Sequence, residues 1–160
     1  MKSGFFILIV LFLIGTGCFS HQQQLELEGY QLPMPTKDEV ARVNGIPFTL
    51  SEFVSIRKSL STRSSDKAYW IGVAALTLVS ETQSRKNPLN YSSALELAKY
   101  AAFESSETQS LESPSEGLKK NLKFHFPTYS DSPSPQQLKA EIEKMTQKIA
   151  VVKNPFSLSD

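Results

Sequence analysis

The segment from about Asp66 to Lys86 constrains the fold most, because its apolar residues are spread too widely for a half-exposed helix. At steps of three and four residues they fill two adjacent stripes, Tyr69, Val73, Leu76 and Trp70, Ala74, Thr77, Leu78. A helix that is apolar over so much of its circumference has to be covered by other elements. We therefore expect it to be the central element. Pro88 should end it, since proline disfavours helical geometry at the residue before it.

Two short extended runs precede this helix and meet at Asn44-Gly45, the strongest short hairpin signal. The runs are Val40 to Val43 and Ile46 to Phe48. Because Pro47 has no amide hydrogen to donate to a neighbour, we expect the second run to be short or to lie at a sheet edge. Near the C-terminus, Ile149 to Val152 predicts one more strand, as a partner for this hairpin.

Four more helices are indicated by capping residues and by apolar residues at helical spacing. Three of them begin with a capping box, in which a hydroxyl and an acid or amide side chain satisfy free backbone N–H groups. These starts are Thr49 to Glu52, Ser93 to Glu96 and Ser134 to Gln137. The fourth is a short helix from Leu118 to Phe126. In the helix that starts at Ser134, the predicted apolar stripe consists of Leu138, Ile142, Met145 and Ile149. Together the elements predict a mostly α fold with a small β-hairpin or sheet, of the α+β class.

The first 17 residues have the composition of an export signal. A short start with Lys2 precedes ten consecutive apolar residues, Phe5 to Ile14, and then Gly15-Thr16-Gly17. A helix that spans a membrane needs about 20 apolar residues, and here polar residues follow too soon. We therefore expect a cleaved signal over residues 1–17 and an exported chain, and not a permanent span.

Cys18, the only cysteine, directly follows this signal. The run Leu13 to Cys18 resembles the lipobox of bacterial lipoproteins, in which the cysteine is acylated and the signal is cut just before it. Gly15 stands where that motif usually has an aliphatic residue, and the next two residues fit. A lipid on Cys18, such as palmitate, would anchor the protein to a membrane. Ordinary cleavage after Gly17 or Ser20, and a buried free cysteine, are the alternatives.

The part that follows the signal has the size of one domain. Without a second cysteine it has no internal disulfide and must hold together by packing. The whole chain has 17 basic and 16 acidic residues, so no long-range field attracts nucleic acid. Residues 18–36 are rich in glutamine and predict a flexible tether. The domain is expected over residues 37–156, with a mobile loop at 104–117 and a linker at 127–135.

The run from Val40 to Phe53 resembles the opening of the exported foldases of the SurA and PrsA type. In those proteins a VNG-x-x-I-T-x-x-E-F segment forms a small hairpin and starts the first helix of the chaperone domain. Thr49, Glu52 and Phe53 match this pattern, and Phe48 stands where isoleucine is frequent. The resemblance implies a helical module like the SurA N-terminal domain, whose last helix and strand pack on the first elements.

The segment between Phe103 and Gln136 is too short for the parvulin domain that the family inserts there. The resemblance therefore implies no proline isomerase activity. It implies a chaperone-like module on the periplasmic side of a membrane that binds non-native or extended polypeptide through exposed apolar and aromatic side chains.

The candidate peptide-binding residues are Phe53, Ile56, Tyr69, Trp70 and Val73. For Tyr69 and Trp70, plain core packing is the competing interpretation. The competing function for the whole protein is that of an envelope lipoprotein that docks on one specific partner.

No residues of the sequence form a recognisable catalytic or metal motif. His125 is the single histidine of the predicted domain, whereas a metal site needs three or four ligands. The serines do not stand in a G-x-S-x-G elbow. We therefore expect a protein that is not an enzyme, that needs no cofactor, and that has neither a small-molecule substrate nor a nucleic-acid partner.

The resemblance at Cys18 predicts a lipid-modified N-terminus. When the chain is produced with its signal in a bacterium, mass spectrometry of the membrane fraction should show an acylated protein that starts at Cys18. The change Cys18→Ser should release the protein from the membrane fraction, because acylation requires the thiol. An unmodified mature N-terminus in the membrane fraction of the unchanged protein would contradict lipid attachment.

Overall fold

The computed structural model describes residues 26–27, 30–31, 34–61, 63–103, 115–128 and 133–155. By its contacts the chain divides into two units, Met1–Leu32 and Pro33–Asp160. In the first unit β1 (Glu26–Leu27) and β2 (Tyr30–Gln31) pair antiparallel, within the stretch predicted to be a tether. Cys18 and the predicted signal lie outside the described residues.

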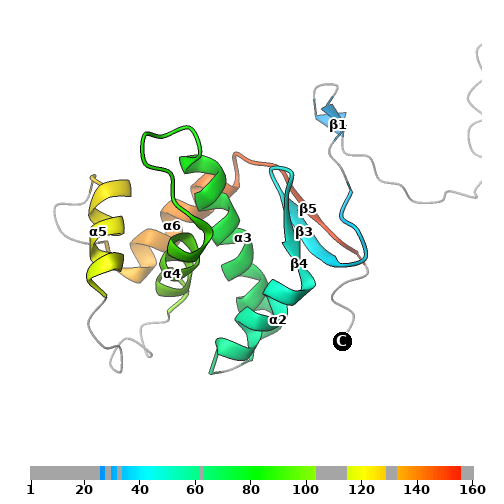
Figure 1. Cartoon of the computed structure of the whole chain (residues 1–160), viewed down its shortest axis with the longest axis horizontal. Helices are drawn as coiled ribbons and strands as arrows, with labels where there is room; N and C mark the ends of the chain where they lie inside the picture. The colour runs from blue at the N-terminus through cyan, green and yellow to red at the C-terminus, as the bar shows by residue number, and fades with distance from the viewer. Residues whose placement is uncertain are drawn as a thin grey trace, which may run out of the picture. The chain divides into compact units, whose positions relative to one another are not determined.

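The described residues of the second unit form five helices and three strands (Figure 1). In chain order they are β3 (Glu39–Val43), β4 (Ile46–Thr49), α2 (Leu50–Ser59), α3 (Ser65–Thr82), α4 (Tyr91–Ala101), α5 (Glu116–His125), α6 (Pro135–Thr146) and β5 (Val151–Lys153). The predicted α+β class, mostly helical with a small antiparallel sheet, is confirmed.

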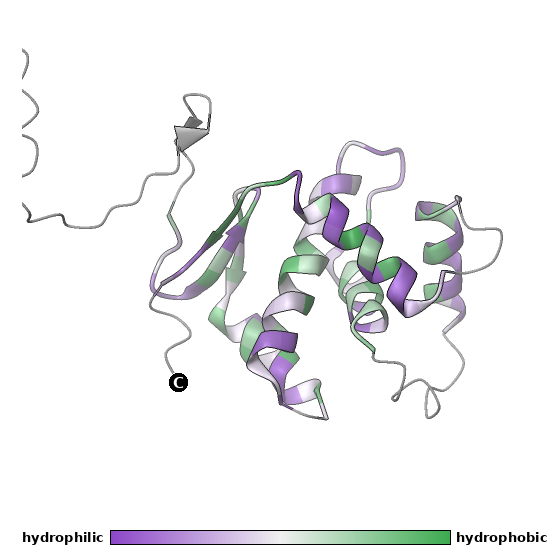
Figure 2. Ribbon diagram, turned by 180° about the vertical axis from the view of Figure 1, so that it is seen from behind, coloured by the Kyte–Doolittle hydropathy of each residue, from purple (hydrophilic) through white to green (hydrophobic). Residues whose placement is uncertain are grey.

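Helix α3 is the central element, as its two apolar stripes predict. All residues from Ile71 to Leu78 are buried. Figure 2 shows the sheet on one side of α3 and the helices α4, α5 and α6 on the other. The helix ends earlier than predicted, at Thr82, because the chain turns back there to bury Leu89. The Leu89 N–H donates a hydrogen bond to the Thr82 hydroxyl at 3.0 Å and so stabilises the turn.

The sheet has the strand order β4-β3-β5, and both strand pairs are antiparallel. Asn44 and Gly45 form the predicted two-residue turn, with φ angles of 49° and 81° that suit a hairpin. The predicted return of the last strand to the front hairpin is confirmed, since β5 pairs with β3 through Arg42 and Val152. Strand β4 lies at an edge, as Pro47 predicts.

Local capping explains where the helices begin. The predicted capping boxes form at the starts of α2 and α6. The predicted start of α4 at Ser93 is wrong, because the helix begins at Tyr91. The Ser93 N–H donates a hydrogen bond to the side chain of Asn90 at 2.9 Å, so Asn90 caps the helix and Ser93 lies inside its first turn.

The two predicted loop ranges, 104–117 and 127–135, both extend into the helix that follows them. Residues 104–114 and 129–132 lie outside the described residues. Ser115 caps α5 by accepting a hydrogen bond from the Leu118 N–H at 3.0 Å, so the helix begins within the predicted loop 104–117. The predicted linker 127–135 likewise reaches the first residue of α6, Pro135.

Gly72 allows the sheet to approach α3 closely. Phe48 of β4 is fully buried, and its ring lies so close to Gly72 that a Cβ atom there would overlap it. The rings of Phe53 and Tyr69 flank Phe48, with centroid distances of 6.2 Å and 6.3 Å. This aromatic cluster joins the sheet to α2 and α3.

Gly72→Ala should therefore destabilise the domain, because the added methyl group has to displace the Phe48 ring. Overpacking of this kind costs about 1–3 kcal/mol, which exceeds the gain of about 0.5–1 kcal/mol from replacing a helical glycine by alanine. Urea unfolding followed by circular dichroism measures the difference.

Gly117→Ala is the matched control, since among the described residues a Cβ at this helical position meets only the Ser115 Oγ, at 3.8 Å. We expect its stability to be unchanged or raised by up to about 1 kcal/mol. Equal stability of the two variants would contradict the close contact between Gly72 and Phe48.

Candidate functional site

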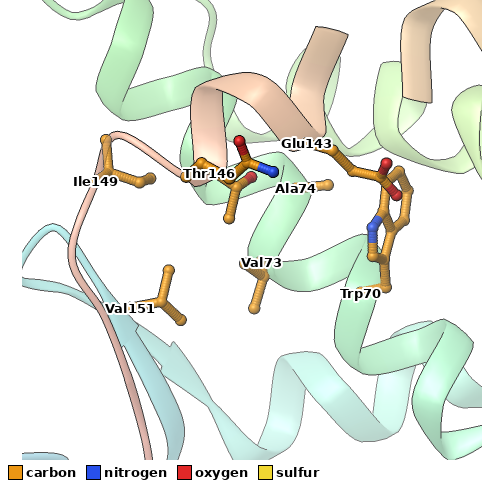
Figure 3. Close-up of a pocket in the computed structure, with 8 residues that line it drawn as sticks. Trp70, Val73, Ala74, Glu143, Thr146, Ile149 and Val151 are labelled. Atoms are coloured by element: carbon orange, nitrogen blue, oxygen red, sulfur yellow. The ribbon is translucent and has the colours of Figure 1, made fainter. Parts of the chain in front are cut away.

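A pocket of about 520 Å³ lies between α3, α6 and β5 (Figure 3). It is lined by Trp70, Val73, Ala74, Glu143, Thr146, Gln147, Ile149 and Val151. Figure 3 shows Ile149 and Val151 on one side of the hollow and the residues of α3 on the other. Two parts of the chain that are distant in sequence thus form the site together.

The lining combines apolar and polar side chains. Val73 and Ala74 are 7% and 2% exposed and form an apolar base. Glu143 and Gln147 are exposed and supply polar groups at the rim. Trp70 is partly exposed and lies at one end of the pocket. Such a lining suits a ligand that offers an apolar side chain together with hydrogen-bonding groups.

A hydroxyl pair links α6 to α3 beside the pocket. The Oγ1 atoms of Thr77, which is buried on α3, and Thr146 on α6 are 3.2 Å apart. Because the Thr146 hydroxyl already donates to the Ile142 carbonyl at 2.9 Å, Thr77 is the donor in this pair. The apolar stripe of α6 was predicted to include Ile149, but the helix ends at Thr146. Ile149 lies in the connection to β5 and lines the pocket there.

Two lysine side chains lie over aromatic rings of α3. The Nζ atom of Lys139, on α6, is 5.5 Å from the centroid of the Trp70 ring. The Nζ atom of Lys153, on β5, is 5.0 Å from that of Tyr69. Both distances fall within the range of cation–π attraction. Burial raises the pKa of Tyr69, which keeps its ring neutral.

The structure brings two of the five predicted peptide-binding residues to the pocket, Trp70 and Val73. Phe53 and Ile56 lie in the core, where they are 5% and 2% exposed. Tyr69 is partly buried and belongs to the aromatic cluster at the sheet. These three residues do not line the pocket.

Sequence reasoning missed the lining residues that come from α6 and β5. Glu143 and Gln147 carry no signal, since exposed polar residues are typical of any solvent-facing helix. For Ile149, by contrast, the sequence did contain a signal that could have indicated its position. It belonged both to the predicted helical stripe and to the predicted strand, which indicated a residue at the junction between them.

Comparison of the chain with known protein families, with curated proteins and with solved structures finds no match. Within the described ranges, no group of three or more His, Cys, Asp or Glu side chains is placed to hold a metal ion. None of the helices in these ranges is both long and apolar enough to span a membrane.

His125 lies away from the pocket, buried near the end of α5. Among the described residues its Nδ1 atom has no hydrogen-bond partner. Burial lowers the pKa of His125 below the usual 6.5, and the positive charge of Arg85 lowers it further. The Arg85 guanidinium donates to the His125 carbonyl at 3.4 Å. The fold therefore favours the neutral imidazole.

Acidification from about pH 7.5 to about pH 5 should lower the free energy of unfolding. In this window the unfolded chain, with a His125 pKa of about 6.5, binds more protons than the folded chain. The loss should level off below the folded pKa. His125→Gln, which cannot take up a proton, should reduce this pH dependence in urea unfolding.

The protonation of Glu39 does not obscure the effect of His125 on stability in this pH range. The hydrogen bond from Arg42 lowers the pKa of its carboxyl below 4.5, so its contribution to stability is lost only at more acidic pH. Identical pH profiles for the unchanged protein and the His125→Gln variant would contradict the role given to His125.

Proposed function

We propose that this protein is a chaperone-like component of the cell envelope that binds unfolded or extended polypeptide, without isomerase activity. The pocket between α3, α6 and β5 is the proposed binding site. The observation that carries the proposal is its lining, in which the buried Val73 and Ala74 lie beside the partly exposed Trp70. Export and a lipid on Cys18 belong to the same proposal, because they would hold the domain at a membrane surface.

The chemistry of the lining fits an unfolded chain. An apolar side chain of ordinary size gains about 1.5–3 kcal/mol when it leaves water completely, so a single pocket binds such a residue weakly and reversibly. Trp70 offers a large, rigid contact area. Glu143 and Gln147 offer polar atoms to peptide groups at the rim. Unfolded polypeptide presents both kinds of group, and its binding requires no bond to be made or broken.

The order of elements also supports the proposal. The hairpin leads into α2, the long helix α3 follows, and the final helix and strand return to β3. This is the arrangement that the resemblance of Val40 to Phe53 to the SurA and PrsA type of foldase implies. The segment between Phe103 and Gln136 is too short for an inserted isomerase domain, so the proposal includes the chaperone part alone.

Docking on one specific envelope partner is the second candidate function. The two lysines over Trp70 and Tyr69 favour it, because charges at fixed positions select partners by electrostatic complementarity. Crosslinking in intact membranes separates the candidates. Many different crosslinked chains would support the chaperone function, and one stoichiometric partner would support docking.

Ile149→Ser should weaken client binding, because it removes an apolar part of the pocket lining. A loss of about 1 kcal/mol of apolar contact corresponds to about fivefold weaker binding. Light scattering of an aggregating unfolded client measures the effect, with the full chain at near-equal molar ratio. The fluorescence of Trp70, the only tryptophan, reports binding directly.

Phe124→Ser is the matched control. Phe124 is 53% exposed on α5 and does not line the pocket, so its loss should leave both readouts unchanged. If the unchanged protein does not slow aggregation at several-fold excess, the chaperone function is wrong. If both variants lose activity equally, the pocket is not the binding site.

A further inference from the structure

We propose that the polypeptide bound at this pocket adds to the free edge of β5 as an antiparallel strand. Its main chain would pair with Val151 and Lys153, and one of its side chains would enter the pocket. This inference rests on the proposed function and specifies the form of the ligand, namely an extended segment recognised through its backbone.

The hydrogen bonds between β3 and β5 determine which groups of β5 are already used. The Asn44 N–H donates to the Ala150 carbonyl at 2.7 Å, and the Asn154 N–H donates to the Val40 carbonyl at 2.9 Å. Successive residues of an antiparallel strand bond alternately toward one neighbour and toward the other side. The even-numbered residues of this segment therefore bond toward β3.

The N–H and C=O groups of Val151 and Lys153 consequently face away from β3. Among the described residues no strand pairs with this edge of the sheet. Free ladder groups that recur at every second residue are complementary to another extended chain. A helix, whose backbone groups are bonded internally, cannot satisfy them.

The opposite edge of the sheet is unsuited to the same addition. Pro47 of β4 stands opposite Arg42 of β3. Because Arg42 bonds toward β5, the backbone of Pro47 faces outward, and proline has no N–H to offer there. The sheet is thus protected at β4 and open at β5, and the open strand is the one that contributes to the pocket.

Val151 connects the edge to the pocket, because its side chain is part of the lining. In an antiparallel pair, residues directly opposite each other place their side chains on the same face. The ligand residue opposite Val151 would therefore direct its side chain to the face of the sheet on which Val151 lines the pocket. An apolar residue is favoured at this position.

The charge of Lys153 adds a second preference. Its Nζ atom lies over Tyr69, on the face of the sheet that Val151 shares. In an antiparallel ligand, the residue opposite Lys153 precedes the one opposite Val151 by two positions. An acidic residue there would be attracted by the ammonium group. The preferred ligand sequence is therefore an acidic residue, then any residue, then an apolar residue.

Backbone methylation of a short peptide tests the main-chain pairing. A peptide with Glu-Ser-Leu at its centre is titrated into the full chain, with Trp70 fluorescence as readout. N-methylation of the Glu or the Leu, whose N–H groups would face β5, should weaken binding about tenfold. N-methylation of the Ser between them, whose N–H would face solvent, should change binding by less than about twofold.

Lys153→Pro tests the same pairing from the protein side, since it removes a free N–H without removing a bond to β3. Pro47 occupies the equivalent outward position on β4, so this geometry accepts proline. Binding should be lost, with urea stability close to that of the unchanged protein. Lys153→Ala keeps the N–H, and it should only abolish the preference for Glu over Gln at the first ligand position.

The outcomes separate the two proposals. No Trp70 response to any peptide or unfolded client would overturn both of them. A response that neither backbone methylation nor Lys153→Pro weakens would overturn the strand addition alone. A dimer of the full chain that Lys153→Pro dissociates, without any peptide binding, would place a second copy on the edge and would also overturn it.

Discussion

The pairing of β5 with β3 joins the last described part of the domain to its first. The side chain of Asn154 reinforces this junction by donating hydrogen bonds to the carbonyls of Thr36 and Glu39, at 3.0 Å and 2.8 Å. The second of these bonds spans 115 residues. Closing so long a loop has an entropic cost, which is offset by the ladder bonds and by burial of apolar residues. Without this return, Ile149 and Val151 would not face α3 and the pocket would not form.

Different elements pack against different parts of α3, and this packing explains the position of the pocket. At Gly72 the missing side chain lets Phe48 fill the space between helix and sheet completely. Between α6 and β5 the α3 side of the gap is formed by Val73 and the small Ala74, and the pocket lies there. The sheet and α6 thus cover α3 from two sides and leave the space between them open, with Trp70 at one end.

Most of the fold followed from short-range patterns. The Asn44-Gly45 turn, the capping boxes of α2 and α6 and the two stripes of α3 each depend on residues close in sequence. The errors arose where a distant contact or a competing cap decided the outcome. Asn90 caps α4 in place of Ser93, and α3 ends at Thr82, where the chain turns back and Leu89 becomes buried.

The sequence by itself determined the helical class, the turn and the central place of α3, because backbone propensity, capping and apolar periodicity are local properties. Only the tertiary structure decided which apolar residues come to line the pocket. Phe53 and Ile56 have the same helical spacing as Trp70 and Val73, yet the first pair lies in the core and the second lines the pocket. The residues that line a pocket depend on which elements pack nearby, and the elements that complete this pocket, α6 and β5, come from the opposite end of the chain.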